Sequence, residues 1–170
     1  MRLIQDDNIL KLSLSNSGHH MITNVFKRCP DWIKSEIFTN VLKHFSQLAQ
    51  DKNGLCVMKE IIKYSRKDDT KMQAIMNELL RDILKFAQHE FANYVVLNVI
   101  TTFPNSISRP VYYYLLNNFT NLSILKYSSN LVEAAIDKAD DELQEKIIEE
   151  FINYERLDKI VLGSFGNYVL

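Results

Sequence analysis

Glycine and proline are scarce in this chain, which has four glycines and three prolines among 170 residues. Both residues are concentrated in turns and weaken helices and strands, so their scarcity indicates few tight turns. Hydrophobic residues make up 46% of the chain. This composition favours helices and excludes both a disordered chain and a turn-rich β fold. A chain of this length usually forms one domain.

Cysteine is also rare, and long apolar runs are missing. Cys29 and Cys56 lack the paired spacing of metal ligands, and we expect both to stay reduced in an intracellular protein. Charged residues break every apolar run well before about 18 residues, so we expect no membrane span. Residues 1–7 lack the apolar core of a signal peptide. Without a glycine-rich phosphate loop, a metal cluster or a nucleophile triad, we expect no enzyme activity, no cofactor and no metal.

Strong positive charge is absent as well, because the formal net charge is -1. A protein that holds nucleic acid mainly through phosphates is usually strongly basic. If the chain binds nucleic acid, the binding would therefore have to depend on base stacking and on hydrogen bonds to base edges. Residues 140–150 form an acidic segment, which we interpret as a solvated outer surface or, alternatively, a surface for a protein partner. Its carboxylates belong to Asp140, Asp141, Glu142, Glu145, Glu149 and Glu150.

The stretch Ser128-Ser129-Asn130-Leu131-Val132-Glu133 carries the most specific chemistry. On a helix, Ser129 and Glu133 lie four residues apart on one face, with Asn130 beside them, and we expect both residues to be exposed on that face. Guanine presents two adjacent donors, N1–H and the exocyclic amino group, and an ionised carboxylate can accept from both. The alternative interpretation is an N-capping serine followed by a solvated glutamate.

Similar stretches recur along the chain at nearly constant spacing. Each has a small residue, two variable residues and then two mostly branched or sulfur-containing apolar residues. The other four stretches are residues 18–23, 54–59, 92–97 and 166–170. Their second residues, with Ser129, fall at positions 19, 55, 93, 129 and 167, in steps of 36, 38, 36 and 38. A period of roughly 20–50 residues is typical of a solenoid, whose units bury their apolar faces against their neighbours.

With the repeats aligned, the chain resembles the Pumilio (PUF) family of RNA-binding repeat proteins. The segments 92–96, 129–133 and 166–169 are similar to the sixth, seventh and eighth repeats of that family. The resemblance implies an all-α, right-handed α-solenoid of Pumilio-type three-helix repeats, each about 36–38 residues long. Residues 1–170 would form one Pumilio-like repeat domain of about four and a half repeats. Because PUF domains usually carry eight repeats, the chain looks like the carboxyl-terminal part of one.

The repeats predict three helices per unit. Motif helices are expected near residues 18–29, 54–64, 91–102, 128–138 and 166–170. Outer helices are expected over 32–44, 70–80, 111–118 and 140–153, and short helices over 8–15, 45–50 and 84–88. Asp31 is predicted to cap the first outer helix, residues 51–54 to form a turn, and Pro110 to lie in the first turn of its helix.

The resemblance also implies a role for three positions in each motif helix. Two residues four apart would read the base edge, and the residue after the first would stack on the base. The stacking residues would be His20, Cys56, Tyr94, Asn130 and Tyr168. The edge readers would be His19 with Thr23, Leu55 with Lys59, Asn93 with Leu97, Ser129 with Glu133, and Asn167.

Several of these residues differ from the family pattern. Leu97 stands where a uracil-reading repeat has glutamine, and Leu55 and Lys59 replace the pair that would normally read adenine. His19 and Thr23 replace asparagine and glutamine. We therefore expect base specificity to be concentrated in the carboxyl-terminal repeats.

The predicted function is binding of single-stranded RNA on the concave face, with no catalysis. The resemblance implies antiparallel binding and a core of 5′-U-G-U, within 3′ untranslated regions of messenger RNA. It also implies repression or decay of these messengers in the cytoplasm, through protein partners on the convex face. One alternative is a helical-repeat scaffold for protein–protein contacts. Another is a PUF-like nucleolar protein of ribosome assembly that binds nucleic acid without sequence preference.

The carboxyl-terminal edge is expected to need a cover. Leu170 is only the fifth residue of the last motif, and an uncapped solenoid end exposes an apolar face. Further chain, a partner or a second copy is expected to cover Val161, Leu162, Tyr168 and Leu170.

Overall fold

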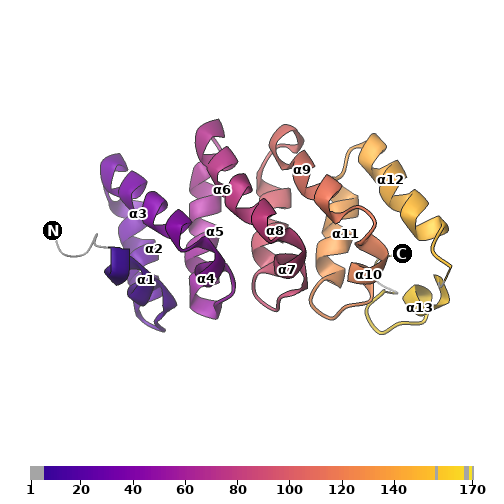
Figure 1. The fold of residues 1–170 in the computed structure, drawn as a ribbon. Coiled ribbons are helices and arrows are strands. Elements are labelled where there is room, and N and C mark those ends of the chain that lie inside the picture. Colours follow the sequence, from indigo (N-terminus) through magenta and orange to yellow (C-terminus); the bar gives the residue numbers. More distant parts are fainter. Residues whose placement is uncertain (1–5, 156, 167–168, 170) are drawn as a thin grey trace.

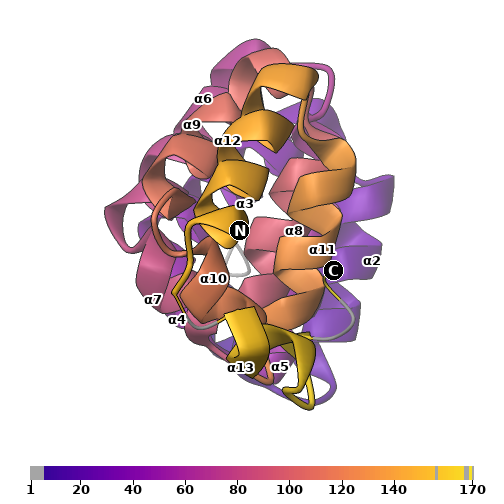
Figure 2. The same cartoon turned by 90° about the vertical axis from the view of Figure 1, so that its right-hand side faces the viewer.

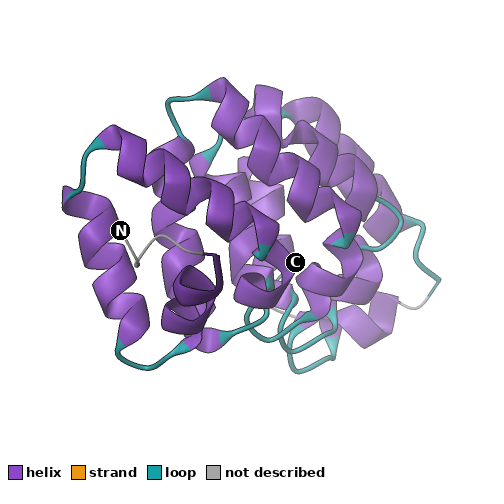
Figure 3. Cartoon of the chain, turned by 60° about the vertical axis from the view of Figure 1, so that its left-hand side comes forward, coloured by secondary structure: helices purple, strands orange, loops and turns teal. Residues whose placement is uncertain are grey.

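The fold is a row of three-helix units, seen in a computed structural model that describes residues 6–155, 157–166 and 169. Thirteen helices and no strand occur in this part of the chain, which confirms the all-α solenoid (Figure 3). No helix among the described residues is long and apolar enough to cross a bilayer.

Motif helices and outer helices form two layers (Figures 1 and 2). The motif layer contains α2 (Gly18–Arg28), α5 (Lys52–Ser65), α8 (Asn93–Thr102) and α11 (Ser129–Lys138). The outer layer contains α3 (Asp31–Lys43), α6 (Asp69–Arg81), α9 (Asn105–Leu115) and α12 (Asp141–Ile152). The short helices are α1 (Asp6–Leu14), α4 (Phe45–Ala49), α7 (Ile83–Gln88), α10 (Phe119–Ser123) and α13 (Leu157–Val161). Each motif helix contacts the next motif helix along the row.

The core runs continuously between the two layers because each helix buries one apolar stripe. In α5 the stripe is Val57, Met58, Ile61 and Ile62, all almost fully buried, at the spacing of one helix face. The equivalent stripe of α8 is equally buried and consists of Val95, Val96, Val99 and Ile100. Stacking of these stripes places the other side of every motif helix at the surface.

The start of α5 differs from the turn that the sequence predicted over residues 51–54. Asp51 caps this helix, and its carboxylate accepts hydrogen bonds from the backbone N–H groups of Asn53 and Gly54, both at 2.8 Å. The helix therefore begins at Lys52 and not at residue 54. Gly54 lies against α4, where an added Cβ would come within 2.4 Å of the Leu48 carbonyl oxygen. This close approach explains the small residue that opens the motif.

Three other predicted boundaries were wrong. The outer helix α9 begins after Pro104, which is its N-cap, and Pro110 lies inside the helix and not in its first turn. Proline is tolerated there at the loss of one backbone hydrogen bond. Pro30, not Asp31, is the N-cap of α3, and α8 begins at Asn93 and not at residue 91. Most of the fifth motif helix, predicted over 166–170, lies outside the described residues.

The carboxyl-terminal face of the row exposes a position that every earlier repeat buries. Ile148 of α12 is 48% exposed, whereas Tyr112 of α9, at the same distance from its N-cap, is 0% exposed. Met76 and Phe38 occupy this position in the two preceding outer helices and are also buried. Ile152, one turn further along α12, is more exposed still. A fifth outer helix would cover these isoleucines in the same way.

The amino-terminal face shows the mirror image of this pattern. Met21 of α2 is exposed, whereas the equivalent Val57, Val95 and Leu131 are buried against the preceding motif helix. The described repeats therefore form a row with an apolar contact surface at each end.

Candidate nucleic-acid interface

The exposed side of α2, α5, α8 and α11 is called the inner face below. Its first row lies in the first turns of these helices and consists of the predicted stacking residues His20, Cys56, Tyr94 and Asn130. All four side chains are exposed, so they are open to a ligand along one line of the surface. The fifth predicted stacker, Tyr168, lies outside the described residues, as does Asn167.

The first edge-reading position is buried in all four described repeats, contrary to the expectation that Ser129 is exposed. Ser129 is 6% exposed, and His19, Leu55 and Asn93 are buried to a similar degree. The position immediately before the stacking residue turns toward the segment that precedes the helix. Only the rim of such a side chain remains within reach of a base.

Two of the polar residues at this buried position bond to the backbone one turn earlier. The Asn93 side-chain amide nitrogen donates to the carbonyl oxygens of His89 at 2.7 Å and Glu90 at 3.0 Å. In the first repeat, His19 Nδ1 lies 3.0 Å from the Ser15 carbonyl oxygen, again four residues earlier. Because carbonyls only accept, they use both amide hydrogens of Asn93 and leave its Oδ1 as an acceptor.

The second edge-reading position is more open and differs in chemistry from repeat to repeat. Glu133 is exposed and forms no ion pair or hydrogen bond with another described residue, so its carboxylate is free to accept. Thr23 donates its hydroxyl hydrogen to the His20 carbonyl at 3.0 Å, which turns it toward its own helix. Leu97 is partly buried and packs against the core.

Lys59 interacts with the stacking residue of the next repeat. Its Nζ lies 5.4 Å from the centroid of the Tyr94 ring, a cation–π distance. Lys59 itself is exposed, and Tyr94 is 37% exposed. The ammonium group of the second repeat therefore borders the ring on which a base of the third repeat would stack.

Four of the six acidic residues at 140–150 are exposed, as expected of a solvated outer surface, but part of the segment also forms ion pairs. Arg109 of α9 forms ion pairs with Asp140 and Glu142, and Lys146 pairs with Glu142 at 2.7 Å. These bonds, from Lys146 first and then Arg109, lower the pKa of the Glu142 carboxyl. The carboxylates thus join neighbouring outer helices.

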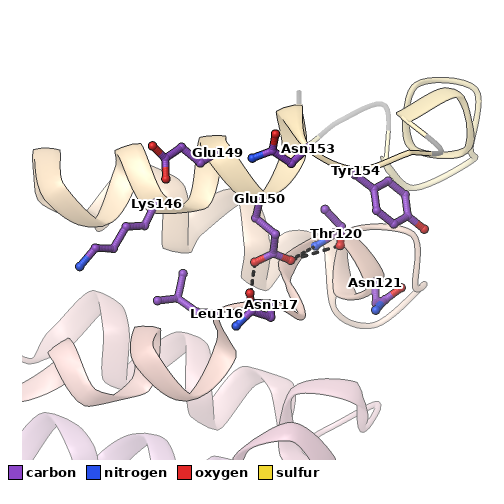
Figure 4. A pocket seen from close by; sticks show the side chains of 9 residues that line it. All are labelled: Leu116, Asn117, Thr120, Asn121, Lys146, Glu149, Glu150, Asn153 and Tyr154. Carbon is purple, nitrogen blue, oxygen red and sulfur yellow. Dashed lines mark hydrogen bonds between the residues drawn. The ribbon is translucent and has the colours of Figure 1, made fainter.

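Glu150 has a structural role that sequence reasoning missed (Figure 4). Its carboxylate accepts from the backbone N–H of Asn117 at 2.7 Å and from the backbone N–H of Thr120 at 3.0 Å. The Thr120 hydroxyl adds a third bond at 3.1 Å. Asn117 has a φ of 66°, which is typical of a turn. The Asn117-Asn118 pair was the signal in the sequence for this turn, whose free backbone N–H groups need an acceptor such as Glu150.

A cavity of about 560 Å³ surrounds this carboxylate, on the outer side between α9, α10 and α12. It lies away from the inner face, and Glu150 already satisfies the backbone groups in it (Figure 4). Both cysteines are free, and the described residues contain no group of three or more metal-ligating side chains. The inner face, in contrast, combines a row of exposed side chains with the unpaired carboxylate of Glu133.

Comparison with known proteins agrees with this geometry. The family model described as the Pumilio-family RNA binding repeat matches residues 44–80, 82–107 and 120–152, which is more than half of the chain. Pumilio homolog 12 of Arabidopsis thaliana is 32% identical over 95% of the chain. Fem-3 mRNA-binding factor 2 of Caenorhabditis elegans is 24% identical over 99% of it. The chain spans only 27% and 31% of these two proteins.

Solved structures show the same architecture. The Puf4 RNA binding domain bound to an RNA 3′ UTR recognition sequence superposes with a TM-score of 0.87, at 14% identity. The Puf3 RNA binding domain bound to Cox17 RNA gives a TM-score of 0.86, at 20% identity. The alignments cover 97% and 96% of this chain and 50% and 45% of those chains. The repeats, the fold and the matching family model together show that the chain belongs to the Pumilio family of repeat proteins.

Proposed function

We propose that the chain binds single-stranded RNA on its inner face and reads the core 5′-U-G-U. The observation that carries this proposal is the α11 set, in which exposed Glu133 lies one turn beyond Ser129 and Asn130. A free carboxylate on this ridge complements the two adjacent donors of guanine and repels the carbonyl oxygens of uracil. The matching family and the RNA-bound structures of similar domains support the choice of ligand.

The third repeat would read the uracil that follows the guanine. Asn93 keeps one acceptor, Oδ1, which suits the N3–H of uracil, and exposed Tyr94 supplies a ring for stacking. Leu97 adds no polar contact, so selectivity at this base should be weaker than at the guanine. Asn167 and Tyr168 are proposed to read the first uracil by analogy with Asn93 and Tyr94.

The cellular role is proposed from the same relatives. We infer that the chain acts on 3′ untranslated regions of messenger RNA in the cytoplasm and lowers translation or stability through proteins on its outer surface. The end faces favour a further partner, because Ile148, Ile152, Val161 and Leu162 are exposed apolar residues. More repeats or a second copy would bury them.

The test is binding of the chain to short RNAs measured by fluorescence anisotropy. An RNA with a U-G-U core should bind, and replacing its guanine by adenine should weaken binding by about tenfold, as expected for one mismatched base. A scrambled RNA of the same length controls for charge. Equal binding of all RNAs would indicate the ribosome-assembly alternative, and no binding would indicate the protein scaffold.

Protection of Cys56 gives an independent readout of the site. This exposed thiol lies in the stacking row, whereas Cys29 is half-buried and ends α2 away from that row. Bound U-G-U RNA should slow alkylation of Cys56 and leave the rate at Cys29 unchanged. Equal rates at Cys56 with and without bound RNA would place the RNA elsewhere.

A further inference from the structure

The second repeat has a reader set unlike the other described repeats, and it borders the third repeat through a contact between side chains. Its first position is Leu55, buried and apolar; its stacking position is Cys56; and its second edge position is Lys59. Lys59 is the only group of the three with strong hydrogen-bonding capacity, and an ammonium donates three hydrogens and accepts none.

The contact with Tyr94 fixes where this ammonium lies. Lys59 Nζ is 5.4 Å from the centre of the Tyr94 ring and forms no ion pair with another described residue. A base read by the second repeat would lie between Cys56 and the face of the Tyr94 ring that Lys59 covers, opposite the face that takes the uracil of the third repeat. Such a base would displace the lysine, because base–aromatic stacking is the stronger interaction at an exposed site. The flexible side chain would then remain at the rim of the base, where the base edge lies.

We propose that the second repeat selects cytosine, so that the preferred sequence is 5′-U-G-U-C. This inference rests on the proposed RNA-binding function. Cytosine has two adjacent acceptors, N3 and O2, on its Watson–Crick edge, and the Lys59 ammonium can donate to both. Adenine offers one acceptor beside a donor, and guanine presents two donors on that edge. Uracil presents acceptors that are separated by a donor. Because Leu55 is apolar, the first edge position offers no hydrogen bond that could compensate for a wrong base.

Four RNAs that differ only in the base after U-G-U test the proposal with the intact chain. The cytosine RNA should bind about tenfold more tightly than the adenine RNA, which corresponds to one discriminating base contact. Equal affinity for all four RNAs would overturn the cytosine selection and leave the U-G-U function intact. Binding to none of them would overturn both. A preference for guanine would also overturn it, because lysine would then be reading the O6 and N7 edge.

Variants at Lys59 separate base reading from general attraction to phosphate. Lys59→Gln donates and accepts, so it should reduce the cytosine preference to less than about threefold. Lys59→Arg remains donor-only and should keep the preference. Lys63→Gln, one turn further along the same helix and also exposed, is the matched control for loss of charge. If Lys59→Gln and Lys63→Gln weaken all four RNAs equally, Lys59 contacts the phosphate backbone and the proposal is wrong.

Discussion

The packed side of the motif helices keeps the same chemistry in every repeat, whereas the inner face changes from repeat to repeat. Val57, Val95 and Leu131 are equivalent, apolar and buried. The second edge position, in contrast, holds threonine, lysine, leucine and glutamate in turn. Stacking of units requires one kind of surface, while a sequence of different bases requires different readers. Stability and base choice should therefore respond to separate sets of residues within the same helix.

Leu131→Ala should give the largest effect and change stability alone. Leu131 is 1% exposed, and truncation of a buried leucine costs about 2–5 kcal/mol of unfolding free energy. Urea unfolding followed by circular dichroism measures this loss. The adjacent Asn130→Ala, on the inner face, should change stability by less than about 0.5 kcal/mol and weaken RNA binding. A loss of stability of similar size in both variants would contradict the division between the two sides.

Tyr112 of the outer helix α9 is a large buried side chain with a polar group, and it predicts a dependence of stability on pH. Burial raises its pKa to about 12, and its hydroxyl has no hydrogen-bond partner among the described residues. Because the folded state holds this proton more tightly, stability should be full below about pH 10 and fall as pH rises toward 12. The loss should be about 2–3 kcal/mol.

Tyr112→Phe is the control for that pH dependence. The variant should unfold with a weaker dependence on pH in this window. At neutral pH it should be as stable as the parent or more stable, because an unpartnered buried hydroxyl is removed. Unchanged pH dependence in the variant would assign the effect to other groups.

Ser129→Asn with Glu133→Gln should change base choice and largely spare the fold. The carboxylate accepts only, whereas the two amides can also donate to the oxygens of uracil. The double variant should prefer U-U-U to U-G-U, with a discrimination of about 1–3 kcal/mol by anisotropy. Although Ser129 is buried, Asn93 shows that this position accommodates an asparagine whose amide bonds to the preceding turn. Unchanged preference in a folded variant would mean that these two residues do not read the base.

Asp51→Ala should have a smaller effect, confined to the start of α5. The change removes two hydrogen bonds to backbone N–H groups, and loss of an N-cap costs about 1 kcal/mol. Thermal unfolding measures the loss, and Lys52→Ala, at the exposed next residue, serves as the neutral control. Equal melting temperatures for the parent and Asp51→Ala would mean that packing alone determines where this helix begins.

Salt should have the smallest effect, because reading by edges and stacking depends little on phosphates. Affinity for U-G-U should fall by less than about tenfold between 50 and 200 mM salt. A steep logarithmic slope, equivalent to some six or more neutralised phosphates, would show that backbone contacts dominate. Titrations at several salt concentrations provide the slope.

The sequence predicted the fold well because the same spacing of apolar residues recurs in each repeat. The 36- and 38-residue steps and the buried stripes are confirmed in the described repeats. The predicted starts of α5, near Asp51, and of α9, near Pro110, were wrong. Whether a capping residue or a proline marks the start of a helix depends on how the neighbouring segments pack. Asp51 acts through two backbone groups inside the segment that looked like a turn.

The candidate site was predicted less completely. The stacking row is exposed as expected, but the burial of Ser129 and Asn93 depends on the preceding segment, which helical spacing alone does not place. The contact between Lys59 and Tyr94 joins residues 35 positions apart in different repeats, and no pattern within one repeat encodes it. The readers themselves remain a prediction that RNA binding has to test.

The exposed end faces have a consequence for how the molecule opens. Among the described residues, the second and third units are stacked on both sides, whereas the first and fourth units each contact one neighbouring motif helix. In such a linear array, opening should start at the ends and move inward, because each terminal unit is held by a single interface. Amide hydrogens of α5 and α8 should then exchange with solvent last. The repeats should unfold in stages, and the base-reading residues of the second and third repeats should stay in place after those of the terminal repeats are lost.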